Sequence, residues 1–175
     1  NLEFNQTLNL NIAEAVTVPT GKTWKITSAT HREIIIDGVD KLGGGAHQPI
    51  GDRIEAITYI ICGLATNSEI TVKGFDPEFI SDVINILKSM GANLVVSDDS
   101  VTTKESNLKP YHVVTAPYPG FPTDLQAQLI AALTISNGVS EIQENIFENR
   151  FMHVSELKRM GANLALDKAK VRVKG

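Results

Sequence analysis

One stretch of the sequence, PYPGFPTDLQAQ at residues 117–128, places a carboxylate at the start of an apolar helical pattern. Each of its prolines fixes φ near about −65° and biases the residue before it toward an extended conformation, so the approach to the helix is stiff. We expect Thr123 to be the N-cap and Asp124 to lie in the first turn, where the helix dipole favours an ionised carboxylate. Such rigidity is useful where a charged group must meet a ligand in one geometry.

Asp124 alone leaves two interpretations open, an acid that only complements the helix dipole or a functional carboxylate. A second stretch, ENIFENRFMHVSELKRMGA at 144–162, favours the functional interpretation. It places Phe147, Asn149 and Arg150 at a predicted turn between a strand and a helix. The planar donor fork of a guanidinium suits carboxylate or phosphate, so this turn is a candidate anion-binding site.

The elements that must position these residues belong to an internal repeat. LKSMGANLVV at 87–96 recurs as LKRMGANLAL at 157–166, and DRIEAITYIICGLATNSEI at 52–70 aligns with DLQAQLIAALTISNGVSEI at 124–142. In the first copy, an ordinary FDPE turn occupies the place of the turn that carries Arg150. A repeat of this length indicates one supersecondary unit that occurs twice.

Each copy is predicted to be roughly an αβαββ unit, with a linking strand such as YHVVTA at 111–116 in front of it. The first helix of each copy, at 53–65 and 124–135, is apolar nearly all round, which indicates burial on most sides. We therefore expect an α/β (α+β) fold with the helices buried and the sheet outside. The two units span about 39–105 and 106–175.

The second helix of each unit has clear start and stop signals. Asp76 is a natural N-cap, with Pro77 at the first helical position. Gly91 and Gly161 are expected to end the two helices in the left-handed conformation that glycine tolerates. A pair of strands is predicted to close each unit.

The apolar helices of the two units need other parts of a protein to keep their surfaces from water. They expose apolar surface unless further units or a self-association partner cover it. Alternatively, the two units close on each other as one compact domain. The sequence leaves both arrangements open.

Composition and charge exclude several classes of function. The net charge is −4 with acids and bases interspersed, which argues against nucleic-acid binding. No apolar run reaches the roughly 20 residues of a membrane span, and the first residues lack a signal-peptide pattern, so we expect a cytoplasmic protein. The histidines lack metal-ligand spacing, and we expect neither metal nor cofactor. The single cysteine, Cys62, cannot form an internal disulfide and is predicted to be a small buried residue.

Residues 1–30 do not fit the repeat. They alternate in places like β strands and break at 19–21, which predicts a short β-rich segment whose role the sequence does not reveal. Trp24, the single tryptophan, is expected to be a packing anchor. Residues 31–175 would then form the domain that contains both repeats.

The stretches at 117–128 and 144–162, together with GVDKLGGGAHQPIGDRIEA at 38–56, resemble a known family. They are similar to the UDP-N-acetylglucosamine 1-carboxyvinyltransferases, enolpyruvyl transferases that begin peptidoglycan synthesis. The resemblance runs from about Glu33 to the end of the chain, whereas residues 1–30 look unlike the family. It implies an inside-out α/β barrel built from several such units in two halves, with substrates bound in the cleft between them.

The resemblance also implies an activity and its residues. Family members transfer the enolpyruvyl group of phosphoenolpyruvate to the 3-hydroxyl of UDP-N-acetylglucosamine and release phosphate. Asp124 matches the aspartate that contacts this hydroxyl and is the general base. Ile146 and Phe147 match residues that lie against the nucleotide sugar, and Arg150 matches an arginine of the active-site cleft, where we expect it to bind an anion.

The chain departs from the family in what it lacks. It resembles only part of one half of such an enzyme, and the family's reactive cysteine belongs to the other half. Cys62 is in the wrong motif and setting to replace it, and the family's groups that hold phosphoenolpyruvate are also absent. We therefore expect the chain to be inactive alone and to need the remaining units. The alternative is a non-catalytic binding or structural module derived from the enzyme repeat.

Overall fold

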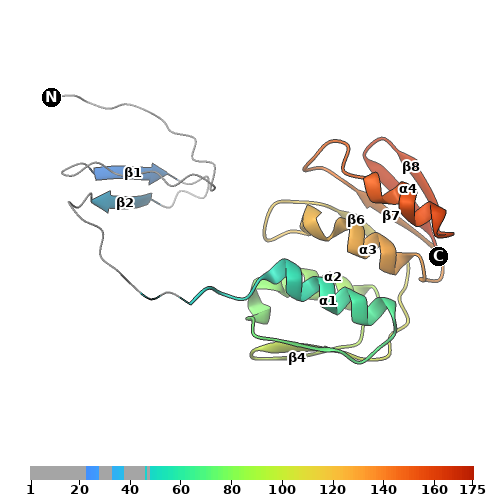
Figure 1. The fold of residues 1–175 in the computed structure, drawn as a ribbon, viewed down its shortest axis with the longest axis horizontal. Coiled ribbons are helices and arrows are strands. Elements are labelled where there is room, and N and C mark those ends of the chain that lie inside the picture. Colours follow the sequence, from blue (N-terminus) through green and yellow to red (C-terminus); the bar gives the residue numbers. More distant parts are fainter. Residues whose placement is uncertain (1–22, 28–32, 38–45, 47) are drawn as a thin grey trace. The chain divides into compact units, whose positions relative to one another are not determined.

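The computed structural model describes residues 23–27, 33–37, 46 and 48–175 (Figure 1). By its internal contacts the chain divides into two compact units, Asn1–Gln48 and Pro49–Gly175. The expected break at 19–21 and the expected boundary between residues 30 and 31 fall outside the described residues. Both therefore stay predictions.

The first unit contains a two-stranded antiparallel sheet. Its strands are β1 (Thr23–Thr27) and β2 (Glu33–Asp37), and their register sets Trp24 opposite Ile36. The packing of the Trp24 side chain lies outside the described part of the chain. Its role as an anchor stays a prediction.

The second unit contains the predicted element order twice (Figure 1). The first copy consists of α1 (Arg53–Ala65), β3 (Thr71–Lys73), a 3-10 turn η1 (Pro77–Ile80) that leads into α2 (Ser81–Ser89), β4 (Leu94–Ser97) and β5 (Ser100–Thr103). The second copy consists of the linking strand β6 (His112–Val114), a 3-10 turn η2 (Thr123–Leu125) that leads into α3 (Gln126–Leu133), β7 (Val139–Gln143), α4 (Met152–Arg159), β8 (Asn163–Asp167) and β9 (Lys170–Lys174). The repeat read from the sequence is therefore a repeat of structure.

The predicted start and stop signals of the second helices are confirmed. The Asp76 carboxylate accepts a hydrogen bond from the backbone N–H of Glu78 at 2.9 Å, and Pro77 begins η1. Gly91 and Gly161 have φ values of 93° and 100°, which a residue with a Cβ adopts only with strain. Both glycines follow the helix ends and let the chain reverse into the strand pair.

The predicted N-cap of the helix after the proline loop is wrong. The Thr123 hydroxyl donates to the Glu144 carboxylate at 2.8 Å, and the structure gives it no capping hydrogen bond to the helix backbone. The reason is that a buried acceptor competes successfully for this hydroxyl. The helix begins instead with the 3-10 turn η2, and Asp124 lies in that turn.

The second unit is layered, with helices between two sheets. The strand orders are β3-β5-β4 and β6-β7-β9-β8, and all neighbours are antiparallel except β6 and β7. Helix α1 packs on the first sheet, α3 packs on the second, and the two helices pack against each other (Figure 1). This arrangement confirms the expectation of buried helices with the sheets outside.

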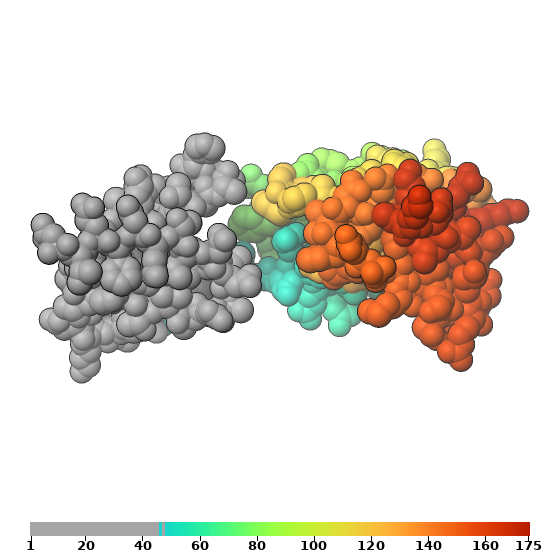
Figure 2. Space-filling model, turned by 90° about the horizontal axis from the view of Figure 1, so that it is seen from above, coloured from blue at the N-terminus to red at the C-terminus, as the bar shows by residue number. Residues whose placement is uncertain are grey.

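The core runs through both copies as one cluster of apolar side chains. Its fully buried members include Ile57 and Ile60 of α1, Leu129 and Leu133 of α3, and Ile142 of β7. The space-filling view shows the two copies packed as one body from Pro49 onward (Figure 2). The two copies therefore close on each other, which is one of the two arrangements that the sequence left open.

Helix α1 nevertheless leaves one stripe uncovered. On α1 this stripe includes Tyr59, which is 54% exposed, and Cys62, so the prediction of a buried cysteine is wrong. Cys62 faces away from both the sheet and α3, which cover the other sides of α1. Just beyond α3, Ile135 is 57% exposed. Within the described residues, none of the helices is long and apolar enough to cross a bilayer.

Candidate functional site

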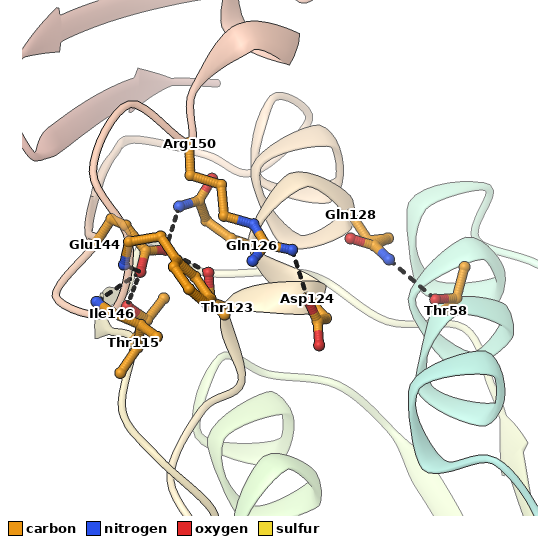
Figure 3. A network of polar contacts seen from close by, with 10 residues as sticks. Thr58, Thr115, Thr123, Asp124, Gln126, Gln128, Glu144, Ile146 and Arg150 are labelled. Carbon is orange, nitrogen blue, oxygen red and sulfur yellow. Dashed lines mark hydrogen bonds and ion pairs between the residues drawn. The ribbon is translucent and has the colours of Figure 1, made fainter. Parts of the chain in front are cut away.

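Asp124 and Arg150 come together although they lie in different elements (Figure 3). The Nη2 atom of Arg150 donates to Oδ1 of Asp124 at 2.5 Å, and the two side chains are 37% and 54% exposed. Both line a hollow of about 360 Å³ whose wall also includes Thr123, Gln126, Ala127, Met152 and His153. The acid behind the prolines therefore faces a concave surface together with a cation.

The first copy of the repeat shows that this pair is not a requirement of the fold. Asp52 aligns with Asp124, but its carboxylate caps α1 by accepting from the N–H groups of Ile54 and Glu55. By the strand registers of the two sheets, Ile80 of the first copy stands at the place of Arg150, two residues after the FDPE turn that we expected there, so the first copy has no cation to pair with Asp52. In the second copy the acid has left the capping role and bonds to a cation at the hollow.

The proline loop in front of η2 is fastened by hydrogen bonds and packing. The N–H of Ala116 donates to the carbonyl oxygen of Phe121 at 2.9 Å, and the Phe121 side chain is buried. The Tyr118 ring lies under the guanidinium of Arg53, with 5.0 Å from Cζ to the ring centroid. The loop therefore contacts the start of α1, and its predicted stiffness has a structural basis.

The loop 144–150 brings the other predicted residues to the same region. The Arg150 guanidinium lies over the Phe147 ring at 5.0 Å, and the ring is 55% exposed. Asn149 has a φ of 56°, a conformation that asparagine adopts more readily than most residues, so it turns the chain toward α4. Ile146 is half-buried and its backbone N–H donates to Glu144. Arg150 thus lines the hollow, and the Phe147 ring lies against its guanidinium. The backbone N–H of Ile146 is held by the Glu144 carboxylate.

Sequence reasoning missed Glu144, the buried carboxylate on which these segments converge (Figure 3). Its side chain is 3% exposed and accepts hydrogen bonds from both sides of the site. A signal for it exists in the repeat, because the strand registers set Gly74 of the first copy at the place of Glu144. A carboxylate directly after a strand, where the other copy has a glycine, is the pattern that would have found it.

Two groups near the hollow have shifted pKa values. Burial raises the pKa of the Glu144 carboxyl, but hydrogen bonds from Thr123, the Ile146 N–H, Thr115 and the Phe147 N–H outweigh burial, so the pKa lies below the usual 4.5. Burial lowers the pKa of His153 below the usual 6.5. The site therefore combines an ionised buried carboxylate with a histidine that stays neutral at pH 7.

The neutral His153 predicts a pH dependence of stability. Its pKa is lower in the folded than in the unfolded chain, so the unfolded chain binds the proton first as the pH falls below about 6.5, and stability is lost in that window. We expect His153→Phe to remove this part of the slope. Urea unfolding followed between pH 5 and 7 would measure it, and equal slopes in the two proteins would contradict the prediction.

Among the described residues, no three histidine, cysteine, aspartate or glutamate side chains gather closely enough to hold a metal ion. The chemistry available at the hollow is that of a half-exposed carboxylate and a guanidinium, and the Phe147 ring lies against that guanidinium. A carboxylate can take a proton from a hydroxyl, and a guanidinium can hold an anion. Such a site suits proton transfer beside a negatively charged ligand.

Comparison with known proteins shows the family to which the chain belongs. A family model described as EPSP synthase (3-phosphoshikimate 1-carboxyvinyltransferase) matches residues 8–174. The chain belongs to the EPSP synthase family. The match starts before Glu33, where we expected the resemblance to begin, and so takes in most of the N-terminal segment that we expected to look unlike the family.

Relatives within this family carry the name that the sequence motifs predicted. The UDP-N-acetylglucosamine 1-carboxyvinyltransferase of Rhodopseudomonas palustris (strain HaA2) is 45% identical over 145 residues, which are 82% of this chain and 34% of that protein. The protein of the same name from Prochlorococcus marinus (strain AS9601) is 44% identical over 151 residues, 86% of this chain and 33% of that protein. The chain thus spans about a third of the length of these relatives, and the predicted resemblance is confirmed.

Solved structures confirm the fold. The enolpyruvyl transferase NikO from Streptomyces tendae superposes with a TM-score of 0.65 at 27% identity, covering 72% of this chain and 30% of that one. An EPSP synthase from Acinetobacter baumannii superposes with a TM-score of 0.60 at 20% identity, covering 86% of this chain and 37% of that one. Both are enolpyruvyl transferases, which confirms the fold class expected from the repeat and the resemblance.

Proposed function

We propose that this chain forms part of a UDP-N-acetylglucosamine 1-carboxyvinyltransferase. The enzyme would transfer the enolpyruvyl group of phosphoenolpyruvate to the 3-hydroxyl of UDP-N-acetylglucosamine and release phosphate, a cytoplasmic step of peptidoglycan synthesis. The observation that carries the proposal is the Asp124–Arg150 pair at the hollow, in a chain whose relatives bear this enzyme's name. Asp52, the equivalent acid of the first copy, makes no such pair and caps α1 instead.

In this proposal Asp124 is the general base. Arg150 donates to Oδ1, so the lone pairs of Oδ2 remain for a substrate hydroxyl. Taking the hydroxyl proton as the new C–O bond forms is a role that a carboxylate within hydrogen-bond reach performs well. The Asp124–Arg150 pair is half-exposed, and such pairs are weak enough for a ligand to rearrange them.

The other predicted residues would contact the nucleotide sugar and an anionic group of a substrate. Phe147 offers an exposed ring, and Ile146 precedes it on a loop whose backbone is fixed by Glu144. We assign these two residues to the nucleotide sugar. We assign Arg150 to a negatively charged group of either substrate, because its guanidinium already lies at the hollow beside Asp124.

The exposed apolar side chains on α1 and just beyond α3 fit a role as part of a larger enzyme. The parts of the relatives that this chain does not span would cover Tyr59, Cys62 and Ile135 in the proposed complete enzyme. We therefore expect the chain alone to release no phosphate when it is mixed with both substrates. Phosphate release by the chain alone would contradict this dependence on further units.

The proposal is tested by joining this chain to the segments that its relatives carry beyond it. The complete enzyme is expected to release phosphate only when both substrates are present. Titration of the same protein with UDP-N-acetylglucosamine is expected to show saturable binding. A properly folded complete enzyme that neither binds the nucleotide sugar nor releases phosphate would favour the non-catalytic alternative.

Arg150→Gln is expected to lower kcat/KM of the complete enzyme by about tenfold to a hundredfold. The change removes a charge-assisted hydrogen bond, which contributes about 1.5–3 kcal/mol. Steady-state phosphate release at varied phosphoenolpyruvate and varied UDP-N-acetylglucosamine would show which substrate Arg150 contacts. Arg159→Gln is the matched control, because Arg159 pairs with Glu156 on the exposed side of α4. Equal activity of both variants would remove Arg150 from the site.

A further inference from the structure

The Glu144 carboxylate joins three separate segments beneath the hollow (Figure 3). It receives five hydrogen bonds, from Thr115 Oγ1 at 2.9 Å, Thr123 Oγ1 at 2.8 Å, Gln126 Nε2 at 2.6 Å, and the backbone N–H groups of Ile146 at 2.8 Å and Phe147 at 3.1 Å. The donors come from the end of β6, from both sides of Asp124, and from the loop that leads to Arg150. One buried carboxylate therefore connects the two halves of the site.

This carboxylate is stabilised by donors, and among the described residues no cation pairs with it. An ionised group at 3% exposure is costly unless its lone pairs are satisfied. Several donors aimed at a carboxylate hold it in the charged form. The charge in turn fixes every donor, because moving any one of them leaves part of a buried charge unpaired.

The repeat provides an internal comparison. By the strand registers, Gly74 of the first copy stands at the place of Glu144, and Ile54 and Gly51 align with Gln126 and Thr123, so the first copy cannot form this network. The first copy still folds into the same helix and strands. The network is therefore not needed to build the repeat, and it occurs in the copy that carries the Asp124–Arg150 pair.

We infer that Glu144 is a positioning residue for Asp124 and Arg150. Through Thr123 and Gln126 it fixes the turn η2 on both sides of Asp124, and through the N–H groups of Ile146 and Phe147 it fixes the loop before Arg150. It sets the distance between the two functional side chains without touching the substrate. This inference rests on the proposed function for its kinetic consequence, but its structural consequence can be measured separately.

The kinetic experiment uses Glu144→Val, which removes the carboxylate and leaves an apolar side chain in its buried place. In the complete enzyme we expect kcat/KM to fall at least tenfold. In an Asp124→Asn background the same change is expected to have less than a twofold effect, because a residue that acts through Asp124 has nothing left to position. An equal loss in both backgrounds, or a loss below twofold in the wild type, would overturn the inference.

Glu144→Gln keeps the test decisive where the valine variant fails to fold. The Oε1 atom of Gln126 is buried and has no hydrogen-bond partner, so the new amide can donate to it once the Gln126 amide turns over. We expect this variant to retain more activity than Glu144→Val and to show the same dependence on Asp124. Glu141→Gln in β7, the strand just before Glu144, is the control, because the Glu141 carboxylate pairs with Lys170 on the outer face of the sheet.

Amide hydrogen exchange in the chain itself separates the inference from the proposed function. In Glu144→Val, the N–H groups of Ile146 and Phe147 are expected to exchange at least tenfold faster, while that of Ile142 in β7 stays protected; in Glu144→Gln, whose amide oxygen can still accept from both groups, the rise is expected to be smaller. A wild-type complete enzyme without transferase activity would contradict the proposed function alone. Unchanged exchange at Ile146 and Phe147 would contradict the positioning role whatever the activity.

Discussion

Asp124→Asn is expected to lower kcat of the complete enzyme by about 10²–10⁴, the range over which a positioned general base contributes. The amide has nearly the same size and can still bond to Arg150, but it cannot accept the proton of the sugar hydroxyl. Because the side chain is half-exposed at a hollow, the change leaves no buried charge unpaired. The loss should therefore appear in the chemical step rather than in folding.

Three measurements test the effect of Asp124→Asn. Steady-state phosphate release gives kcat, titration with UDP-N-acetylglucosamine gives Kd, and thermal unfolding reports on the fold. We expect the Kd to stay within about threefold, a difference of less than 1 kcal/mol. Near-normal kcat would remove Asp124 from the mechanism, and a large rise in Kd would assign it to binding instead.

Asp52→Asn is the matched control, because Asp52 occupies the aligned position of the first copy. Its carboxylate caps α1 by bonding to the Ile54 and Glu55 N–H groups, and asparagine is a comparably good cap. This variant is expected to keep both its stability and its kcat. A comparable loss of kcat in the two variants would point to a general effect of charge rather than to a base at Asp124.

The sequence predicted the elements of the fold well where each depended on local signals. Helix α1 was predicted at its observed bounds because an apolar run begins after Asp52, which caps it, and ends before the turn at Asn67. Gly91 and Gly161 marked helix ends because a positive φ at these places favours glycine. The repeat then allowed one copy to be read from the other.

The predictions that failed depended on long-range partners. Thr123 was expected to cap a helix, but the acceptor that takes its hydroxyl, Glu144, lies just after β7, far along the chain. Cys62 was expected to be buried because free cysteines usually are, yet burial depends on which neighbours cover each side of its helix. Periodicity within one helix carries no information on either point.

The candidate site was predictable in its residues and not in its geometry. Asp124 and Arg150 were found from their residue types and from the motifs around them, but their direct contact follows from the packing of η2 against the loop after β7. Glu144 was not found, although it holds both segments. Comparing the two copies position by position separates residues that the fold needs from residues that one copy adds, and here it points to Glu144, Gln126 and Arg150.

Leu129→Ala is expected to lower the free energy of unfolding by about 2–5 kcal/mol, the usual cost of a leucine-to-alanine change in a core. Leu129 is fully buried on α3, which packs between α1 and the second sheet. The variant leaves a cavity in the layer that joins the two copies. Urea unfolding followed by circular dichroism would measure the change.

The repeat adds a second expectation to the same experiment. Ile57 of α1 aligns with Leu129 and is also fully buried, so Ile57→Ala should cost a similar amount. Ile135→Ala is the control, because that side chain is 57% exposed and should change stability by no more than about 0.5 kcal/mol. If Ile135→Ala lowered the free energy of unfolding as much as the core variants do, the Ile135 side chain would already be covered in solution. If both core variants lowered the free energy of unfolding only slightly, the packing of α1 on α3 would not be the main source of stability. Another part of the fold would then have to hold Asp124 in place.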